Sequence, residues 1–504
     1  MIIIIDFGSQ TAHLIGRRLR QIGAPYSYVT PDEALKKIST EKPTGIILSG
    51  GPSSVYEPEA PSIPIEVIDF GGPVLGICYG WQLMAEKLGG VVESGHKEYG
   101  PEKVSFSKPE LIGMPVESCK VYMSHGDTVT KLPPGFESIG NTAHVANAAV
   151  VNQKKNFFGV QFHPEAAHTE HGQDVLKHFA QEICHEKLEP LTLNPDEIIE
   201  EIKSKVGDKK VICGVSGGVD STVASFLIGK AIGQQLLPVY IESGFMRPGT
   251  REQVEHIFRE LIDAPLTVVE AEEQCMSALK GVTDPEKKRK IIGKLYVELF
   301  SKEAAKHKDA AFLGQGTIYS DVIESKGSKH ASAIKSHHNV GGLPKDMHLE
   351  LLEPVRLFYK DEVREIGRLV GLPEETVMQQ PFPGPGFAIR IRGEVTPERL
   401  AQAKQADIIV LEEIGAAGLL NQVFQCFPVM TGAESTAVKG DGRVFAEVIA
   451  IRAYESDDVM TSQWAHLPYE VLGRISSRIV NEVLNVSRVV YDITTKPPAT
   501  MEWE

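Results

Sequence analysis

Residues 74–80, Val-Leu-Gly-Ile-Cys-Tyr-Gly, decide the fold class of the first part of the chain. An unbroken apolar run, Val74–Ile77, leads directly into Cys78, which has a glycine two residues away on each side. Short continuous apolar runs are typical of strands that are buried on both faces of a parallel sheet. The sequence therefore predicts a buried strand, a sharp turn at Cys78 and a helix that begins just after it.

Similar apolar runs surround this segment within residues 1–188. Ile2–Ile5 and Gly45–Leu48 are two of them, and Phe157–Phe162 predicts a further strand that ends in His163-Pro164-Glu165. A helix is expected from Asp174 to Glu186. Alternation of such runs with helical stretches predicts an α/β domain.

The same order of elements starts again after a linker at Glu186–Pro195, where prolines interrupt any helix. The expected elements are a strand at Lys210–Val215, a tight loop at Ser216–Asp220, a helix at Ser221–Ile232 and a strand at Leu236–Ile241. A strand, a crossover helix and a second strand in this order predict another parallel sheet.

The last part of the chain differs in kind from the first two. The composition shifts near Gln380–Arg392, and Thr396 followed by Pro397 predicts a capped helix start. Strands are expected at Val444–Ala453 and Arg488–Thr494, with a helix at Tyr469–Leu484 between them. The predicted fold is therefore two successive parallel-sheet α/β domains, at 1–188 and 189–380, followed by a smaller α+β domain at 381–504.

Bulk properties narrow the functional class. The chain has 504 residues, of which 42% are hydrophobic and 24% charged, and its formal net charge is −15. An acidic chain lacks the broad basic footprint of a nucleic-acid binder, so no nucleic-acid partner is expected. The six cysteines are scattered without a Cys-x-x-Cys pair, which favours a reducing cytoplasm. The N-terminus lacks a basic leader and no apolar run approaches the ~20 residues of a membrane span, so no membrane association is expected.

The turn at Cys78 has the chemistry of a nucleophile. A helix N-terminus stabilises a thiolate and offers free N–H groups to an oxyanion, here from Tyr79 and, across the sheet, from Gly51. A cysteine nucleophile needs a base and the base needs an orienting group, and His163 and Glu165 are suitably spaced for these roles. The alternative is a buried core thiol and an ordinary loop histidine.

These residues resemble the class I glutamine amidotransferase family over about residues 1–188. The resemblance implies that Cys78 forms a γ-glutamyl thioester and releases ammonia, with His163 as general base and acid and Glu165 as its orienting carboxylate. Trp81 departs from the family pattern and is expected to affect packing rather than chemistry.

A second site is indicated by the loop Ser216-Gly217-Gly218-Val219-Asp220-Ser221, which continues into Thr222. Its glycines and the helix start behind it suit an anion, although a glycine-rich turn without a ligand is the alternative. The Walker lysine is absent. The loop resembles that of the N-type ATP pyrophosphatases, which implies ATP as co-substrate, release of pyrophosphate, and Mg²⁺ held by Asp220. Glu242-Ser243-Gly244 is a weaker candidate for contact with adenosine.

Five separated stretches resemble the glutamine-hydrolysing GMP synthase family across the full length. They are Thr317–Ser325, Ser336–Pro344, Lys360–Arg364, Pro381–Gly386 and Lys496–Glu504. The resemblance implies that xanthosine 5′-monophosphate (XMP) is adenylated at O2 with ATP, and that ammonia from glutamine displaces AMP to give GMP. It also implies a homodimer formed through the last domain. Because free ammonia is mostly non-nucleophilic ammonium at neutral pH, a shielded route for ammonia is expected.

The resemblance assigns further residues. Lys496 is expected to contact the XMP phosphate and Glu502 the purine, with Gln425 and Arg443 as weaker candidates. Lys335 and Lys360 are expected to contact phosphate, and the segment that holds Lys326, Lys329, Lys335, His337 and His338 to act as a lid. Asp321 and Glu324 are candidates for holding Mg²⁺ or orienting substrate.

Two other readings of the chain stay open from the sequence. The first keeps both catalytic sites but changes the acceptor, as in a glutamine-dependent NAD synthase or a tRNA-modifying adenylating enzyme. The second is a non-catalytic protein, a degenerate amidotransferase that senses nucleotides or docks a partner. The match at Lys496–Glu504 disfavours the first, and the intact residues of both sites disfavour the second.

Overall fold

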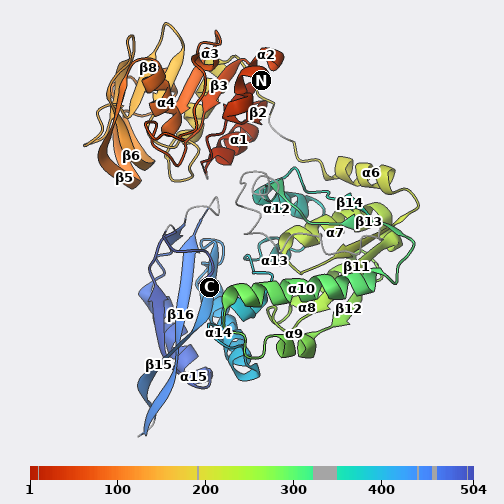
Figure 1. Cartoon of the computed structure of the whole chain (residues 1–504). Coiled ribbons are helices and arrows are strands. Elements are labelled where there is room, and N and C mark those ends of the chain that lie inside the picture. The colour runs from red at the N-terminus through yellow and green to blue at the C-terminus, as the bar shows by residue number, and fades with distance from the viewer. Residues whose placement is uncertain are drawn as a thin grey trace. The chain divides into compact units, whose positions relative to one another are not determined.

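The computed structural model describes residues 1–9, 11–189, 192–319, 321, 349–439, 442–456, 462–496 and 498–504. The chain divides into two compact units, Met1–Thr192 and Leu193–Glu504, which are considered separately below (Figure 1). The finer division at residue 380 stays a prediction.

The first unit contains a nine-stranded sheet in the order β2-β1-β3-β4-β9-β8-β7-β5-β6. Its strands are β1 Ile2–Ile5, β2 Tyr26–Val29, β3 Gly45–Leu48, β4 Val74–Ile77, β5 Val91–Phe106, β6 Ser118–Lys131, β7 Glu137–Asn141, β8 Ala149–Asn152 and β9 Phe157–Val160. The five strands from β2 to β9 are parallel, as predicted, whereas β8, β7, β5 and β6 pair antiparallel. The antiparallel half was not foreseen.

Helices cover both faces of the parallel half. They are α1 Ala12–Gln21, α2 Ala34–Glu41, α3 Ile65–Ile68, α4 Tyr79–Lys87 and α5 Gly172–His178. Because side chains alternate along a strand, Ile2 and Ile4 pack in a core with residues of α1 and α5, while Ile3 and Ile5 pack with residues of α2 and α4. The helix predicted from Asp174 starts at Gly172 and continues after His178 as a wider π-type turn, Phe179–Ile183.

The second unit opens with a five-stranded parallel sheet in the order β12-β11-β10-β13-β14. Its strands are β10 Lys210–Gly214, β11 Leu236–Glu242, β12 Thr267–Glu270, β13 Ala310–Gly314 and β14 Glu350–Leu352, and its helices are α6 Pro195–Val206, α7 Val219–Ile232, α8 Thr250–Glu255, α9 Glu272–Ala278, α10 Pro285–Ala304, α12 Lys360–Leu369 and α13 Glu374–Val377. Val211 and Cys213 pack with α7, and Ile212 packs with Ala304 of α10, so these two helices cover opposite faces. The second parallel sheet is as predicted.

A four-stranded, mainly antiparallel sheet completes the second unit. It consists of β15 Gln425–Lys439, β16 Gly442–Glu455, β17 Gln463–Trp464 and β18 Val486–Asp492, covered by α14 Pro397–Ala416 and α15 Tyr469–Glu482. The predicted cap is confirmed, because the Thr396 side chain accepts a hydrogen bond from the Arg399 N–H. One hydrophobic core joins Ile292 of α10 to Val410 of α14 and Ile449 of β16. No helix in the described part of the chain is both long and apolar enough to cross a membrane.

Candidate active sites

Cys78 occupies the turn between β4 and α4 with an unusual backbone conformation. Its φ is 49° and its ψ −108°, a region that residues other than glycine rarely adopt. The neighbouring chain is close on both sides. A Cβ on Gly80 would lie 2.3 Å from the Leu48 carbonyl oxygen, and one on Gly76 would lie 2.7 Å from the Trp81 backbone. The flanking glycines therefore permit the tight packing that holds the turn, as the sequence suggested.

The Cys78 thiol lies among polar groups at the carboxyl ends of β4 and β9. The Gln161 side-chain amide donates to Sγ at 3.6 Å, and Sγ lies 3.6 Å from the Ser124 carbonyl oxygen. His163 follows β9, and its Nδ1 is 2.7 Å from Oε1 of Glu165. Cys78 and His163 are 5% exposed and Glu165 is fully buried. The structure thus brings the three predicted residues into one site.

The electrostatics of this site favour a protonated His163. Burial alone would lower its pKa, but the Glu165 carboxylate and Cys78 act in the opposite direction and hold the pKa well above its ordinary value. Cys78 contributes both by charge and by a hydrogen bond to the ring. The imidazole is therefore set to carry a proton between the thiol and the substrate.

A pH-dependent contribution to stability follows from this raised pKa. We expect Glu165→Gln to remove a stabilisation that is fully present below the ordinary imidazole pKa of about 6.5 and is lost as the pH rises through the folded-state value. Urea unfolding of both proteins at about pH 6 and about pH 9.5 measures the difference. An advantage of the wild type that grows toward alkaline pH would contradict the assignment.

The predicted oxyanion donors lie next to one another. A Cβ on Gly51 would be 3.0 Å from the Tyr79 ring, and one on Gly50 would be 3.0 Å from Cε1 of His163. Tyr79 is the first residue of α4, where N–H groups have no acceptor within the helix. Trp81 is completely buried, and its ring fills the space that a side chain at position 159 would need. Its role in packing agrees with the expectation from sequence.

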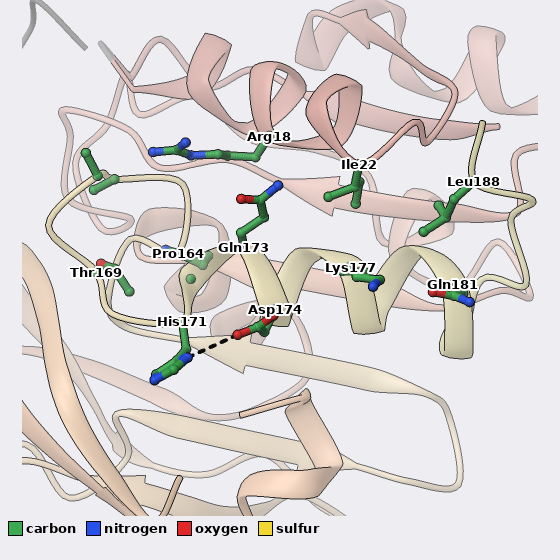
Figure 2. Close-up of a pocket in the computed structure, with 13 residues that line it drawn as sticks. Arg18, Ile22, Pro164, Thr169, His171, Gln173, Asp174, Lys177, Gln181 and Leu188 are labelled. Carbon is green, nitrogen blue, oxygen red and sulfur yellow. Dashed lines mark hydrogen bonds and ion pairs between the residues drawn. The ribbon is translucent and has the colours of Figure 1, made fainter. Parts of the chain in front are cut away.

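A cavity of about 730 Å³ lies next to residues 164–167 (Figure 2). It is lined by Arg18, Ile22, Pro164, Ala166, Ala167, Thr169, His171, Gly172, Gln173, Asp174, Lys177, Gln181 and Leu188. Figure 2 shows the ion pair of His171 with Asp174, in which Nδ1 lies 3.1 Å from Oδ2. Neither Cys78 nor His163 lines this cavity, so it is not the glutamine site.

The second predicted site is the loop between β10 and α7. Hydroxyl groups of Ser216 and Ser221 are 3.0 Å apart, and Ser221 Oγ donates to the Gly218 carbonyl at 3.1 Å. The helix begins at Val219, so Asp220, Ser221 and Thr222 lie in its first turn. The loop thus presents hydroxyl and N–H groups at a helix N-terminus, which suits a phosphate group.

Asp220 and Lys360 meet beside this loop. Asp220 Oδ2 is 3.3 Å from Nζ of Lys360, at the start of α12. Asp220 Oδ1 is buried and has no hydrogen-bond partner among the described residues. Such a carboxylate oxygen fits Mg²⁺, which prefers one or two protein carboxylates together with substrate phosphates. In the described part of the chain, no group of three His, Cys, Asp or Glu side chains is arranged to hold a metal by itself.

Residues 500–502 are held by buried cations. Arg390 is fully buried and donates to Glu502 through Nε at 3.2 Å and Nη2 at 3.1 Å. Arg452 donates to the carbonyl oxygens of Met501 and Thr500 at 3.1 and 2.7 Å. Sequence analysis did not single out either arginine, although Arg390 follows the Pro381–Gly386 stretch that carried the family resemblance.

The predicted XMP contacts are only partly assembled. The Gln425 side-chain amide lies 3.4 Å from Glu502 Oε1, so these two residues share a site. Lys496 pairs with Ser462 through backbone hydrogen bonds. Arg443 is exposed, and along β16 it lies about 35 Å from the position paired with Gln425, at ~3.3 Å per strand residue. The structure therefore does not bring Arg443 to Glu502.

Lys335 and the other members of the expected lid, together with Glu324, lie outside the described residues. Asp321 is described, and its carboxylate accepts a hydrogen bond from the Ile318 N–H at 3.1 Å, which is a local contact at a helix start.

Comparisons with known proteins agree along the whole chain. Family models match at residues 3–183 (Glutamine amidotransferase class-I), 194–290 (NAD synthase) and 412–503 (GMP synthase C terminal domain). A GMP synthase (glutamine-hydrolyzing) of Nitratiruptor sp. is 49% identical over 517 residues, covering 100% of this chain and 99% of that protein. Proteins of the same name from Lactobacillus acidophilus and Clostridium botulinum (strain Hall) are 49% and 48% identical, covering 100% of this chain and 98% and 99% of their own length. Full-length identity at this level means that the chain belongs to the glutamine-hydrolysing GMP synthase family.

Proposed function

We propose that this protein makes GMP from XMP, with ammonia that it frees from glutamine and with ATP that it cleaves to AMP and pyrophosphate. The observation that carries the proposal is the assembly of Cys78, His163 and Glu165 in one buried site of a chain whose relatives are GMP synthases. Glutamine, ATP and XMP are its substrates.

The first half-reaction takes place at Cys78. The thiolate attacks the side-chain carbonyl carbon of glutamine, and the N–H groups of Gly51 and Tyr79 stabilise the oxyanion. His163 gives its proton to the leaving amine, so ammonia departs and a γ-glutamyl thioester remains. His163 then takes a proton from water as that water attacks the thioester and releases glutamate. Glu165 holds the imidazole in the required orientation throughout.

The second half-reaction takes place at the Ser216–Ser221 loop. Its N–H and hydroxyl groups, with Thr222, bind the β- and γ-phosphates of ATP, so that the α-phosphate is open to attack by O2 of XMP. Asp220 would hold Mg²⁺, and the bound ion would supply positive charge to offset that of the departing pyrophosphate. Lys360 pairs with Asp220 beside the loop, so its ammonium group is close enough to leave Asp220 and pair with a bound phosphate. Ammonia then displaces AMP from C2 of the purine.

XMP is proposed to bind beside the segment 494–504. Glu502 supplies a carboxylate for the purine N–H groups, with Gln425 beside it, and Lys496 supplies a cation for the phosphate. Lys335 is proposed to cover the phosphates. Arg443 is proposed to contribute to XMP binding in an assembly of two copies. A homodimer is supported by the exposed apolar side chains Val438 and Phe445, which are 72% and 73% exposed at one end of the β15–β16 pair. A cytoplasmic location is proposed from the unpaired cysteines.

Lys288 provides a specific test of the proposed XMP site. It is fully buried on α10, and its Nζ donates to the Ile391 carbonyl at 2.6 Å and lies 3.2 Å from Oε2 of Glu504. Removing one partner of a buried ion pair leaves a buried charge uncompensated. Lys288 pairs with Glu504, two residues from Glu502, so its loss also loosens the position of Glu502. We therefore expect Lys288→Met to raise the KM for XMP about 10-fold. We also expect it to lower the free energy of unfolding by about 3 kcal/mol.

The adjacent Lys287→Met is the matched control, since Lys287 is exposed on the same helix. Steady-state kinetics with XMP varied and with saturating ATP and ammonium salt measure the effect apart from glutamine hydrolysis. Equal KM values in the Lys288 and Lys287 variants would contradict the proposed site.

The overall function is tested by incubating the full chain with XMP, ATP, Mg²⁺ and glutamine. We expect GMP, AMP, pyrophosphate and glutamate to form in equal amounts. Absence of XMP-dependent turnover would refute the proposal, and turnover with another adenylated acceptor would support the alternative of a different product.

A further inference from the structure

The Glu165 carboxylate is held by one of its two oxygens. Oε1 accepts hydrogen bonds from His163 Nδ1 at 2.7 Å and from the Thr11 hydroxyl at 2.9 Å. Oε2 is buried and has no partner among the described residues. The side-chain donors that fix the carboxylate within the described part of the chain are therefore His163, which it must orient, and Thr11.

Thr11 lies at a position where a threonine hydroxyl normally caps its own helix. It is the N-cap residue of α1, a position at which threonine usually accepts a hydrogen bond from a backbone N–H of the first turn. No such side-chain cap is present in α1. The hydroxyl instead faces Glu165, which is 154 residues away in sequence.

The carboxylate determines the direction of this hydrogen bond, and that direction in turn determines the role of Ser9. Its Oγ is 2.9 Å from the Thr11 hydroxyl and accepts from the Thr11 N–H at 3.1 Å. A hydroxyl has one proton to donate, and an ionised carboxylate only accepts. The consistent arrangement is that Ser9 donates to Thr11 and Thr11 donates to Glu165.

We propose that Thr11 is a positioning residue of the glutaminase site, acting on Glu165 so that Oε1 faces the imidazole of His163. Without this donor, the carboxylate is free to rotate about its last torsion and to turn Oε1 away. The donor also stabilises negative charge on Glu165, so the proton stays on the imidazole, where it is needed for the leaving amine. This inference rests on the proposed roles of Cys78, His163 and Glu165.

The test compares Thr11→Val, which keeps the shape and removes the hydroxyl, with Thr11→Ser, which restores it. We expect Thr11→Val to lower kcat for glutamine hydrolysis by about 10- to 100-fold with little change in KM, the size of effect associated with a hydrogen bond to a charged group. Thr11→Ser should recover most of the rate. Ser9→Ala, which leaves Thr11 in place, should cause a smaller loss. Thr40→Val serves as the matched control, because among the described residues that exposed hydroxyl bonds to carbonyls of its own helix.

A readout independent of glutamine binding is the rate at which iodoacetamide alkylates Cys78, which we expect to fall in Thr11→Val. The proposal is overturned if Thr11→Val keeps the wild-type kcat, or if Thr11→Ser is as slow as Thr11→Val, since the effect would then not come from the hydroxyl. Failure of the proposed function is distinguishable, because Cys78→Ala would then hydrolyse glutamine as fast as the wild type. If Thr11→Val does not fold, a wild-type kcat in Ser9→Ala still overturns the hydrogen-bond chain.

Discussion

Cys78→Ala is expected to lower glutamine-driven GMP formation by about 10⁴-fold or more, while GMP formation from added ammonium salt continues at the wild-type rate. The nucleophile is lost, and neither His163 nor the oxyanion donors can replace a covalent intermediate. The acceptor half of the reaction uses residues of the other unit, from Ser216 to Glu502, which the substitution does not touch. Parallel assays of GMP with glutamine and with ammonium salt measure both halves.

The matched control is Cys119→Ala. Cys119 is another buried cysteine of the same unit, and burial raises the pKa of its thiol to about 11, so it is an inert thiol. We expect this variant to lose about 1 kcal/mol of stability and no activity. If Cys78→Ala loses both the glutamine and the ammonium reactions, Cys78 has a structural role. If Cys119→Ala matches it, the loss is not specific to the nucleophile.

Asp220→Asn is expected to lower GMP formation at least about 100-fold with either nitrogen source. Asparagine keeps the size of the side chain but removes the negative charge that we propose binds Mg²⁺. Release of pyrophosphate should fall in the same proportion, because activation of XMP precedes the entry of ammonia. Alkylation of Cys78 by iodoacetamide should remain as in the wild type, which shows that the first unit is intact.

Asp309→Asn is a suitable control for this substitution. Asp309 is an exposed carboxylate of the same unit, and it pairs at 2.6 Å with Lys210, the first residue of the strand that leads to the nucleotide loop. Surface pairs of this kind contribute little to stability, so activity should be unaffected. XMP-dependent release of pyrophosphate at the wild-type rate by Asp220→Asn would refute the magnesium role.

The parts of the fold that the sequence predicted are those with local signals. Ile2–Ile5, Val74–Ile77 and residues 211–213 are continuous apolar runs followed by glycine-rich or polar turns, and each lies in a strand of a parallel sheet. The antiparallel half of the first sheet was missed for a physical reason. β5 is largely exposed, so it has no apolar run. Its pairing with β6 is set by cross-strand contacts that no local pattern reports.

The site residues also divide into those with a local sequence signal and those without one. Cys78, His163 and Asp220 follow strands in short, recognisable motifs, and the structure places each at the carboxyl end of its strand. Arg390, Arg452 and Lys288 were not predicted, because such residues are ordinarily exposed. Their partners lie far away in sequence, 112 residues in the case of Arg390 and Glu502, so only the folded chain reveals that these charges are paired.

The conformation of Cys78 has a consequence for how sequences of this family can change over time. A φ of 49° with a ψ of −108° costs a residue with a side chain roughly 1–3 kcal/mol, which glycine would avoid. Selection for glutaminase activity therefore opposes selection for stability at this one position. A descendant that lived on external ammonia would be released from the first demand, and drift from Cys78 to glycine would then strengthen its fold. Replacement of the cysteine by glycine would then increase stability, and the return from glycine to cysteine would decrease it.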